Sequence, residues 1–246
     1  MARFFVPKTK IHGDLGVIDG QELQHLRRVL RLAPGDRIIV FDDTGQEHEA
    51  VIRSFGSLSA EIEIIGSRDA QRESPLDLTL AVGLTKGDKM DFVVEKATEL
   101  GVCRIIPFAS IHAVAKLDAA KADRRVARWQ KIALSAAKQC GRTRTPQVMP
   151  LCEFRDMLGW DRPNTLNLFF WEKAPSQSLR QVRDKRGETG SVLIAIGPEG
   201  GFSAEEARAA AAHGFELVSL GQRILRAETA AVTALSLAQF LWGDLQ

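Results

Sequence analysis

From about residue 76 to the end of the chain, short apolar runs alternate with longer segments of helical periodicity. Five of these runs have the length and composition of buried strands: LDLTLAVGL, CRIIPFAS, TLNLFFW, SVLIAIG and FELVSLG. Strands that alternate with helices favour a mostly parallel sheet with helices on both of its faces. We therefore predict an α/β domain over residues 76–246.

Helical segments lie between these runs. In KMDFVVEKATELG the apolar side chains recur at helical spacing, and Gly101 follows at the position of a C-terminal cap. A longer helix is predicted over residues 121–140, where apolar residues follow one face and cations another. A closing helix is predicted over residues 226–242.

The first 70 residues have a different pattern, which is rich in strands. DRIIVFDD and QEHEAVIRSF flank a hairpin-like break at Thr44 and Gly45, and LSAEIEII alternates as a further strand. One short helix is predicted within DGQELQHLRRVLR. These elements predict a small β-barrel over residues 1–70, and we interpret the polar stretch 66–75 as a linker.

Composition excludes several classes of protein. The chain has 246 residues, of which 45% are hydrophobic and 26% are charged, as in ordinary globular proteins. It contains no apolar run of about 18 residues, and MARFFVPKTK lacks the features of a signal peptide, so we expect a cytoplasmic protein without a membrane partner. The three cysteines form no CxxC or Cys/His pattern, so we expect no metal site.

Cations recur at helical spacing within residues 121–140 and just beyond them. Because the net charge is only +2, this placement is more informative than the total charge. The placement fits either a solvated helix surface or a surface that follows RNA phosphates. In the second case, a second cluster of cations in the first domain would contribute to the same surface. The candidate RNA-binding residues are Arg27, Arg28, Arg31, Arg124, Arg128, Lys131, Lys138, Arg142 and Arg144.

The run SVLIAIG ends in the turn IGPEGGFS, which is rich in glycine. Ser203 and Glu206 have the spacing of a capping box, so a helix is predicted to begin there. The glycines permit positive φ angles and a close approach of another molecule to the backbone. The Walker and GxGxxG spacings are absent, and Glu199 would repel a phosphate. The pattern fits either a site for a neutral or cationic ligand or a tight turn without a ligand.

A second turn of similar design follows FELVSLG. Gly221 ends the strand, and Arg226, Glu228 and Thr229 place a cation, an acid and a hydroxyl at the start of the last helix. Local capping and an ion pair would also explain these three residues. If the two strands are adjacent, their turns form a crevice at the carboxyl edge of the sheet, where ligands bind in α/β proteins.

The two turns together, IGPEGGFS and LGQRILRAETA, resemble the signature of the SPOUT methyltransferases, specifically the bacterial 16S ribosomal RNA (uracil-N3)-methyltransferase family. HLRRVLRLAPGD, EKATELGV and WQKIALSAAKQCGRTRTP resemble family segments in the same order, so the resemblance spans nearly the whole chain. It implies a PUA-like RNA-binding barrel, a SPOUT domain with a deep trefoil knot at about residues 190–235, and a homodimer.

The resemblance also implies that S-adenosylmethionine binds between the two glycine turns. The first turn would form one wall, the second turn another, and the end of TLNLFF would close a third side. The cofactor-binding candidates are Leu168, Phe169, Ile196, Gly197, Glu199, Gly200, Gly201, Leu220, Gly221, Ile224, Leu225, Arg226 and Thr229.

The implied reaction is methylation of N3 of a specific uridine in the 16S ribosomal RNA of the small ribosomal subunit. N3 must lose a proton, so the catalytic candidates are Arg226, which would favour the deprotonated base, and Glu228, which would accept the proton or orient Arg226. N3 lies on the Watson–Crick edge, so the target must be unpaired or flipped. The alternatives are a SPOUT methyltransferase that acts on another RNA or on a ribose 2′-oxygen, and a non-catalytic RNA-binding protein.

Overall fold

The computed structural model describes residues 1–111, 119–160, 163–173 and 177–246. The chain divides into two compact units. One comprises Met1–Glu73 and Ala137–Thr145, and the other comprises Ser74–Ala136 and Pro146–Gln246. The first unit therefore takes its residues from two separate stretches of the chain, the second of which includes the end of a long helix.

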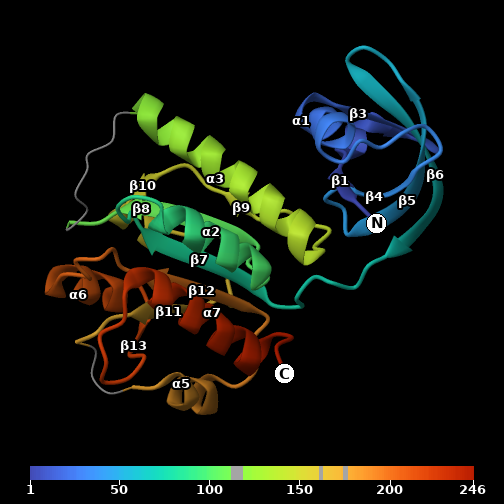
Figure 1. Ribbon diagram of the computed structural model, residues 1–246. Coiled ribbons are helices and arrows are strands. Elements are labelled where there is room, and N and C mark those ends of the chain that lie inside the picture. The colour runs from blue at the N-terminus through green and yellow to red at the C-terminus, as the bar shows by residue number, and fades with distance from the viewer. Residues whose placement is uncertain (112–118, 161–162, 174–176) are drawn as a thin grey trace. The chain divides into compact units, whose positions relative to one another are not determined.

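The first unit is built on one six-stranded sheet (Figure 1). Its elements are β1 (Arg3–Phe5), the 3₁₀ turn η1 (Lys8–Lys10), β2 (Ile11–His12), β3 (Leu15–Asp19), α1 (Gly20–Gln24), the π-helical turn η2 (His25–Val29), β4 (Arg37–Phe41), β5 (Gln46–Phe55) and β6 (Ser59–Asp69). The strand order is β1-β4-β5-β6-β3-β2, and only the β1–β4 pair among them is parallel. The sheet forms a half-barrel around buried side chains such as Phe4, Leu26 and Ile62.

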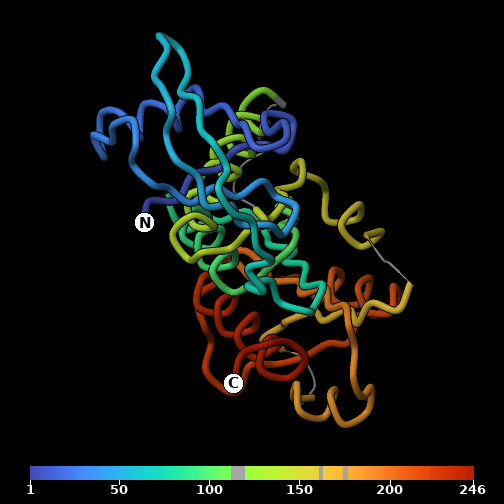
Figure 2. Tube along the Cα trace, turned by 90° about the vertical axis from the view of Figure 1, so that its right-hand side faces the viewer, coloured from blue at the N-terminus to red at the C-terminus, as the bar shows by residue number. Residues whose placement is uncertain are grey.

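Two local predictions in this unit need correction. β6 continues to Asp69, which pairs with Gln46, so residues 66–69 of the predicted linker belong to the β5–β6 hairpin (cyan in Figure 2). The predicted helix within DGQELQHLRRVLR is irregular, because Leu30 donates its N–H to the oxygen of His25 and Arg31 has a φ of 54°. A left-handed residue cannot continue a right-handed helix, so the helix ends there.

The second unit contains a sheet in which every strand pair is parallel. Its elements are β7 (Asp77–Gly83), α2 (Lys89–Glu99), β8 (Arg104–Ala109), α3 (Ala119–Cys140), β9 (Gln147–Val148), β10 (Cys152–Glu153), α4 (Phe154–Leu158), β11 (Leu166–Phe170), α5 (Leu179–Arg186), β12 (Ser191–Ile196), α6 (Ala204–Ala212), β13 (Glu216–Val218) and α7 (Ala227–Trp242). The strand order is β10-β8-β7-β12-β11-β13, with β9 paired to β8. The predicted α/β class with a parallel sheet is confirmed, and the knot stays a prediction.

Both faces of this sheet are buried, which explains the continuous apolar runs. In β12, Val192, Ile194 and Ile196 face a core shared with α2 and α7, whereas Leu193 and Ala195 face a core shared with α4 and α6. α2 and α7 lie side by side over one face (Figure 1). The sheet is therefore held in a three-layer sandwich whose carboxyl edge carries the turns described below.

Gly101 ends α2 as the sequence predicts. Its φ is +80°, and a Cβ atom there would lie 2.6 Å from the amide nitrogen of Gln239 in α7. The Gln239 side chain, which is 1% exposed, donates to the oxygen of Leu100 and accepts a hydrogen bond from the hydroxyl of Ser74. The glycine thus satisfies both the backbone geometry of the helix end and the close packing of α2 against α7.

Candidate functional site

The first glycine turn follows β12 and is held in a compact shape. Gly201 donates its N–H to the oxygen of Pro198 at 2.9 Å and has a φ of +66°. A Cβ atom on Gly201 would lie 3.0 Å from the carboxylate of Glu172, and one on Gly197 would lie 3.1 Å from the ring of Phe202. The positive φ favours glycine at position 201, and close contacts with the turn itself favour glycine at position 197.

The predicted capping box is confirmed at the end of this turn. The Ser203 hydroxyl accepts a hydrogen bond from the N–H of Glu206 at 3.1 Å, and the Glu206 carboxylate accepts one from the N–H of Ser203 at 2.8 Å. The other Glu206 oxygen accepts the N–H of Ile111 at 3.0 Å. These bonds fix the point at which α6 begins and, with it, the exit of the glycine turn.

The second turn joins β13 to α7. Gly221 has a φ of +106°, and its N–H is bonded to the hydroxyl of Ser219. Arg226 is the N-cap residue of α7 and is exposed. The strands that carry the two turns are not adjacent, because β11 lies between β12 and β13. The crevice therefore has a third element at its centre, namely the segment that follows β11.

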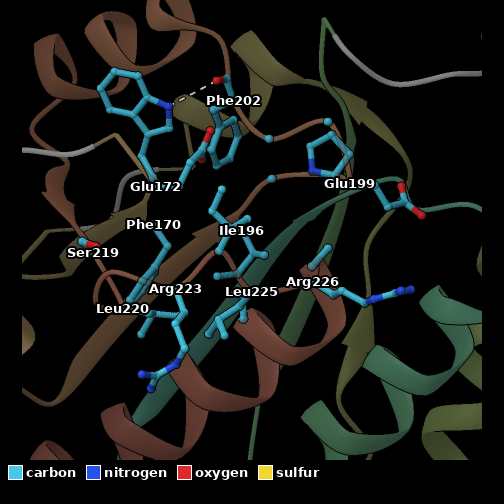
Figure 3. Close-up of a pocket in the computed structure, with 18 of the residues that line it drawn as sticks. Phe170, Glu172, Ile196, Glu199, Phe202, Ser219, Leu220, Arg223, Leu225 and Arg226 are labelled. Carbon is cyan, nitrogen blue, oxygen red and sulfur yellow. Dashed lines mark hydrogen bonds between the residues drawn. The ribbon is translucent and has the colours of Figure 1, made fainter.

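A cavity of about 400 Å³ lies between the three segments. Figure 3 shows Glu199 and Arg226 toward one end, Phe170 and Ser219 toward the other, and Ile196 between them. The lining residues are Lys89, Phe170, Trp171, Glu172, Ile196, Gly197, Pro198, Glu199, Gly200, Gly201, Phe202, Ser219, Leu220, Gly221, Arg223, Ile224, Leu225, Arg226, Ala227 and Ala230. Its size and mixed polar and apolar walls are those of a small-molecule site.

Most of the residues assigned to a ligand site from the sequence lie in this lining. They are Ile196, Gly197, Glu199, Gly200, Gly201, Leu220, Gly221, Ile224, Leu225 and Arg226. Leu168 and Phe169 do not, because both are fully buried in the cores on opposite faces of the sheet. The lining takes Phe170, Trp171 and Glu172 from the same strand end instead. Thr229 is exposed on the first turn of α7 and lies outside the lining.

Some lining residues were not predicted from the sequence. Pro198 and Phe202 belong to the glycine motif itself, so the motif was a sufficient signal for them. Lys89 had no such signal, since it begins α2 and lies 110 residues before Glu199, which it contacts. Only the folded chain brings these two residues together.

One ammonium group faces two carboxylates at the rim of the cavity. The Nζ atom of Lys89 lies 3.1 Å from Oε1 of Glu199 and 4.0 Å from Oε2 of Glu228. Burial alone would raise the pKa of Glu199. Hydrogen bonds from the N–H groups of Lys86 and of Glu199 itself, and then from Lys89, outweigh burial and lower that pKa. Glu199 is therefore a stable anion in the turn.

The two catalytic candidates differ in their access to the cavity. Arg226 is part of the lining, whereas Glu228 is not. The Oε2 atom of Glu228 is buried and has no hydrogen-bond partner among the described residues, although Lys89 is an ion-pair partner at 4.0 Å. Arg226 can thus contact a ligand directly, and Glu228 has a carboxylate oxygen able to accept a proton.

Among the predicted RNA-binding residues, Arg142 requires a correction. Its side chain is only 5% exposed, and Nε and one terminal nitrogen donate to Oε2 of Glu73 at 3.0 and 2.7 Å. The N–H groups of Thr143 and Arg144 donate to the other oxygen of Glu73. A guanidinium that is buried and donates two hydrogen bonds to one carboxylate oxygen is not available to a phosphate, so Arg142 fixes residues 137–145 within the first unit instead.

The other candidates in the first unit are more accessible. Arg28, Arg31 and Arg144 are exposed, and Arg144 donates to the main-chain oxygen of Thr44. Arg27 is half-buried over the ring of Phe55, 4.6 Å from its centroid. Lys138 is bonded to both oxygens of Glu22 at 2.8 and 3.0 Å, so its charge is already offset.

In the second unit the cations of α3 form a shallow groove. Arg124, Arg128 and Lys131 are exposed and line it together with Ala127, Ile132 and Ser135. Trp129 and Ala133 on another face of the helix are buried, as the helical spacing predicts. Arg128 pairs with Asp91 of α2, which leaves Arg124 and Lys131 as the more available charges in this groove.

Two further classes of site were sought in the described part of the chain. No group of three or more His, Cys, Asp or Glu side chains there could hold a metal ion. None of its helices combines the length and the apolar character needed to span a membrane.

Comparisons with known proteins agree with this geometry. A family model described as an RNA methyltransferase domain matches residues 72–239, and one described as an RNA methyltransferase PUA domain matches residues 18–65. The chain is 33% identical over 243 residues to the ribosomal RNA small subunit methyltransferase E of Bacillus subtilis, covering 96% of this chain and 95% of the relative.

A solved structure is similar over the whole length. The ribosomal RNA small subunit methyltransferase E of Neisseria gonorrhoeae, crystallised with bound S-adenosyl methionine, is 35% identical, covers 100% of both chains and has a TM-score of 0.91. A probable rRNA-methyltransferase from Porphyromonas gingivalis is 28% identical, covers 98% of each chain and has a TM-score of 0.82. The two-unit architecture therefore recurs in these proteins.

Proposed function

The chain belongs to the ribosomal RNA small subunit methyltransferase E family, and from this premise we propose that it transfers a methyl group from S-adenosylmethionine to N3 of one uridine in 16S ribosomal RNA. The observation that carries the proposal is the cavity at the carboxyl edge of the parallel sheet, bounded by two glycine turns and the end of β11. Ligands of α/β proteins bind at this edge.

The residues of the cavity fit this cofactor. Ile196, Leu220 and Leu225 offer apolar walls for an adenine ring, and the glycine turns expose main-chain N–H and C=O groups to it. Glu199 places a negative charge at the rim, as a positively charged sulfur requires. When bound, S-adenosylmethionine supplies an activated methyl group.

The protein's own task is to position the uracil and to remove its N3 proton. Arg226, at the start of α7, stabilises the negative charge that develops on the base as the proton leaves. Glu228 lies outside the cavity lining, and its carboxylate is proposed to orient Arg226 or to accept the proton once the uracil is bound. Because N3 lies on the Watson–Crick edge, the target uridine must enter the site unpaired or flipped.

Cations outside buried carboxylate pairs are the proposed contacts to the RNA backbone. In the first unit they are Arg27, Arg28, Arg31 and Arg144, and in the second Arg124, Arg128 and Lys131. Arg142 and Lys138 are already paired with carboxylates and are excluded from this set. Such contacts give affinity without sequence preference, so the choice of uridine rests on the cavity and on the shape of the RNA. A ribosomal RNA substrate places the reaction in the cytoplasm.

The homodimer is proposed to form on the outer face of α7. Phe240 is 64% exposed and Leu237, three residues earlier on the same face, is 38% exposed. Ile224, at the rim of the cavity, is 85% exposed. Exposed large apolar side chains such as Leu237 and Phe240 on one helix face are typical of protein interfaces. Sedimentation of the Phe240→Asp variant should show a monomer, and an unchanged dimer would exclude this face.

Methylation of small ribosomal subunits tests the proposed function. Subunits from a strain that lacks the gene are incubated with the protein and methyl-labelled S-adenosylmethionine, and the nucleosides are analysed by mass spectrometry. We expect one new 3-methyluridine in the 16S RNA. A label on a ribose would overturn the proposed target atom, and the absence of any label on this substrate would overturn the proposed reaction.

A further inference from the structure

Lys89 connects three segments that are far apart in the chain. It is the first residue of α2, and its ammonium contacts Glu199 in the glycine turn after β12. The same ammonium is an ion-pair partner of Glu228 in the first turn of α7. All three side chains are partly buried, with 31%, 28% and 20% of the Lys89, Glu199 and Glu228 side chains exposed. The contacts therefore lie in a region where solvent screens charge less than at a free surface.

Without the Lys89 ammonium, less positive charge would offset the repulsion between the Glu199 and Glu228 carboxylates. The other charged groups that line the cavity are Arg226 at the start of α7, Arg223 in the preceding turn and Glu172 after β11. Lys86, in the segment before α2, bonds Glu199 through its main-chain N–H rather than its side chain. In the described residues, one ion pair of Lys89 joins α2 to the glycine turn, and the other joins α2 to α7.

We propose that Lys89 is a positioning residue of the cofactor site, which ties the glycine turn to the first turn of α7 and holds the Glu199 carboxylate in place at the rim of the cavity. This inference rests on the proposed function, because the charge that Lys89 orients would face the positively charged sulfur of a bound cofactor. Lys89 acts through Glu199 and needs no contact with the cofactor itself.

The pH dependence of binding follows from the same contacts. The pKa of Glu199 is lowered in spite of burial, in part by the hydrogen bond and charge of Lys89. A carboxyl with a lowered pKa stays ionised to a lower pH than usual, and removal of Lys89 raises that pKa. As the pH is lowered, binding of the charged cofactor should therefore begin to weaken at a higher pH in a variant without the Lys89 ammonium than in the wild type.

Calorimetry from pH 4.5 to 8 with two probes tests the proposal. The probes are S-adenosylmethionine and S-adenosylhomocysteine, which share every group except the methyl and the positive charge on sulfur. We expect Lys89→Met to bind S-adenosylmethionine about tenfold more weakly at neutral pH, with a smaller loss for S-adenosylhomocysteine. Its loss of S-adenosylmethionine binding should begin at a higher pH than in the wild type.

Three variants serve as controls. Lys89→Arg keeps the positive charge and should restore most of the affinity for S-adenosylmethionine. Glu199→Gln has no carboxyl at this position and should abolish the loss of S-adenosylmethionine binding at low pH. Lys86→Met alters an exposed neighbouring lysine whose main-chain bond remains, and should leave both affinities unchanged. The role of Lys89 would be overturned if Lys89→Met lost equal affinity for the two probes. It would also be overturned if S-adenosylmethionine binding were lost at the same pH as in the wild type. A wild-type protein that binds neither probe would instead overturn the proposed function.

Discussion

Trp171 donates its indole N–H to the main-chain oxygen of Phe202 at 3.2 Å, and this bond joins the end of β11 to the glycine turn (Figure 3). The ring of Phe202 also packs on that of Phe169, with 3.9 Å between their centroids. The turn is thus fixed both by a hydrogen bond from the neighbouring strand and by an aromatic contact beneath it. A rigid turn can present its main-chain groups to a ligand without a large loss of entropy on binding.

Substitution of Gly201 by alanine should damage this turn in two ways. Its φ of +66° is unfavourable for any residue with a Cβ atom, and that atom would lie 3.0 Å from the Glu172 carboxylate. We expect the free energy of unfolding to fall by about 1–2 kcal/mol and the affinity for S-adenosylmethionine to fall as well. Chemical denaturation and calorimetry measure the two effects.

Gly214→Ala is the matched control. Gly214 has a φ of +80°, but a Cβ atom there would meet nothing within 4 Å. It should show a similar loss of stability with an unchanged cofactor affinity. If both variants bound the cofactor equally well, the glycine turn would not form part of the site.

Removal of the Arg226 guanidinium should slow the methyl transfer far more than it alters cofactor binding, in which Arg226 is one of many lining residues. We expect Arg226→Ala to lower kcat by about 100-fold or more, because the charge that develops on uracil loses its electrostatic partner. Single-turnover kinetics measure the chemical step, and calorimetry measures the affinity for S-adenosylmethionine. A wild-type kcat in this variant would exclude the catalytic role of Arg226.

The Glu73–Arg142 ion pair should contribute to stability rather than to RNA binding. Glu73→Ala removes the carboxylate that the buried Arg142 guanidinium and two main-chain N–H groups share, so we expect a loss of about 3–5 kcal/mol in the free energy of unfolding. Glu188→Ala breaks a pair whose carboxylate is 80% exposed and should cost less than about 1 kcal/mol. Equal effects in thermal denaturation would contradict this assignment.

The groove on α3 should contribute to RNA affinity through charge alone. Replacing both Arg124 and Lys131 by alanine should weaken binding to 16S ribosomal RNA and reduce its salt dependence. The slope of log K against log salt should fall by roughly 0.7–0.9 for each phosphate contact removed. Arg208→Ala, which alters an exposed cation on α6, is the control and should leave the slope unchanged. An unaltered slope in the double variant would show that α3 does not contact RNA.

Much of the fold was predictable because its signals are local. The capping box joins Ser203 to a residue three positions away, and the alternation of strands and helices is visible in short windows. The order of the strands is not local. The sequence shows β11 to precede β12, but it does not show that β11 lies between β12 and β13. Only the family resemblance leads us to expect the end of TLNLFF as a third wall.

The errors at the site have the same origin. Helical spacing placed Arg142 on a basic face, but Glu73, 69 residues earlier, buries and pairs it. Leu168 and Phe169 end an apolar strand, and their burial follows from helices on both faces of the sheet. Lys89 reaches the site because of the way α2 packs, and no local sequence pattern predicts that packing.

A crystal structure of this protein with S-adenosylmethionine tests the central claim most directly. We predict that the cofactor lies in the cavity between residues 170–172, 196–202 and 219–226, with its sulfur on the side of Glu199 and Arg226. A cofactor bound elsewhere on the chain, or one with its sulfur at the Ser219 end, would contradict the assignment of both glycine turns and of the catalytic residues.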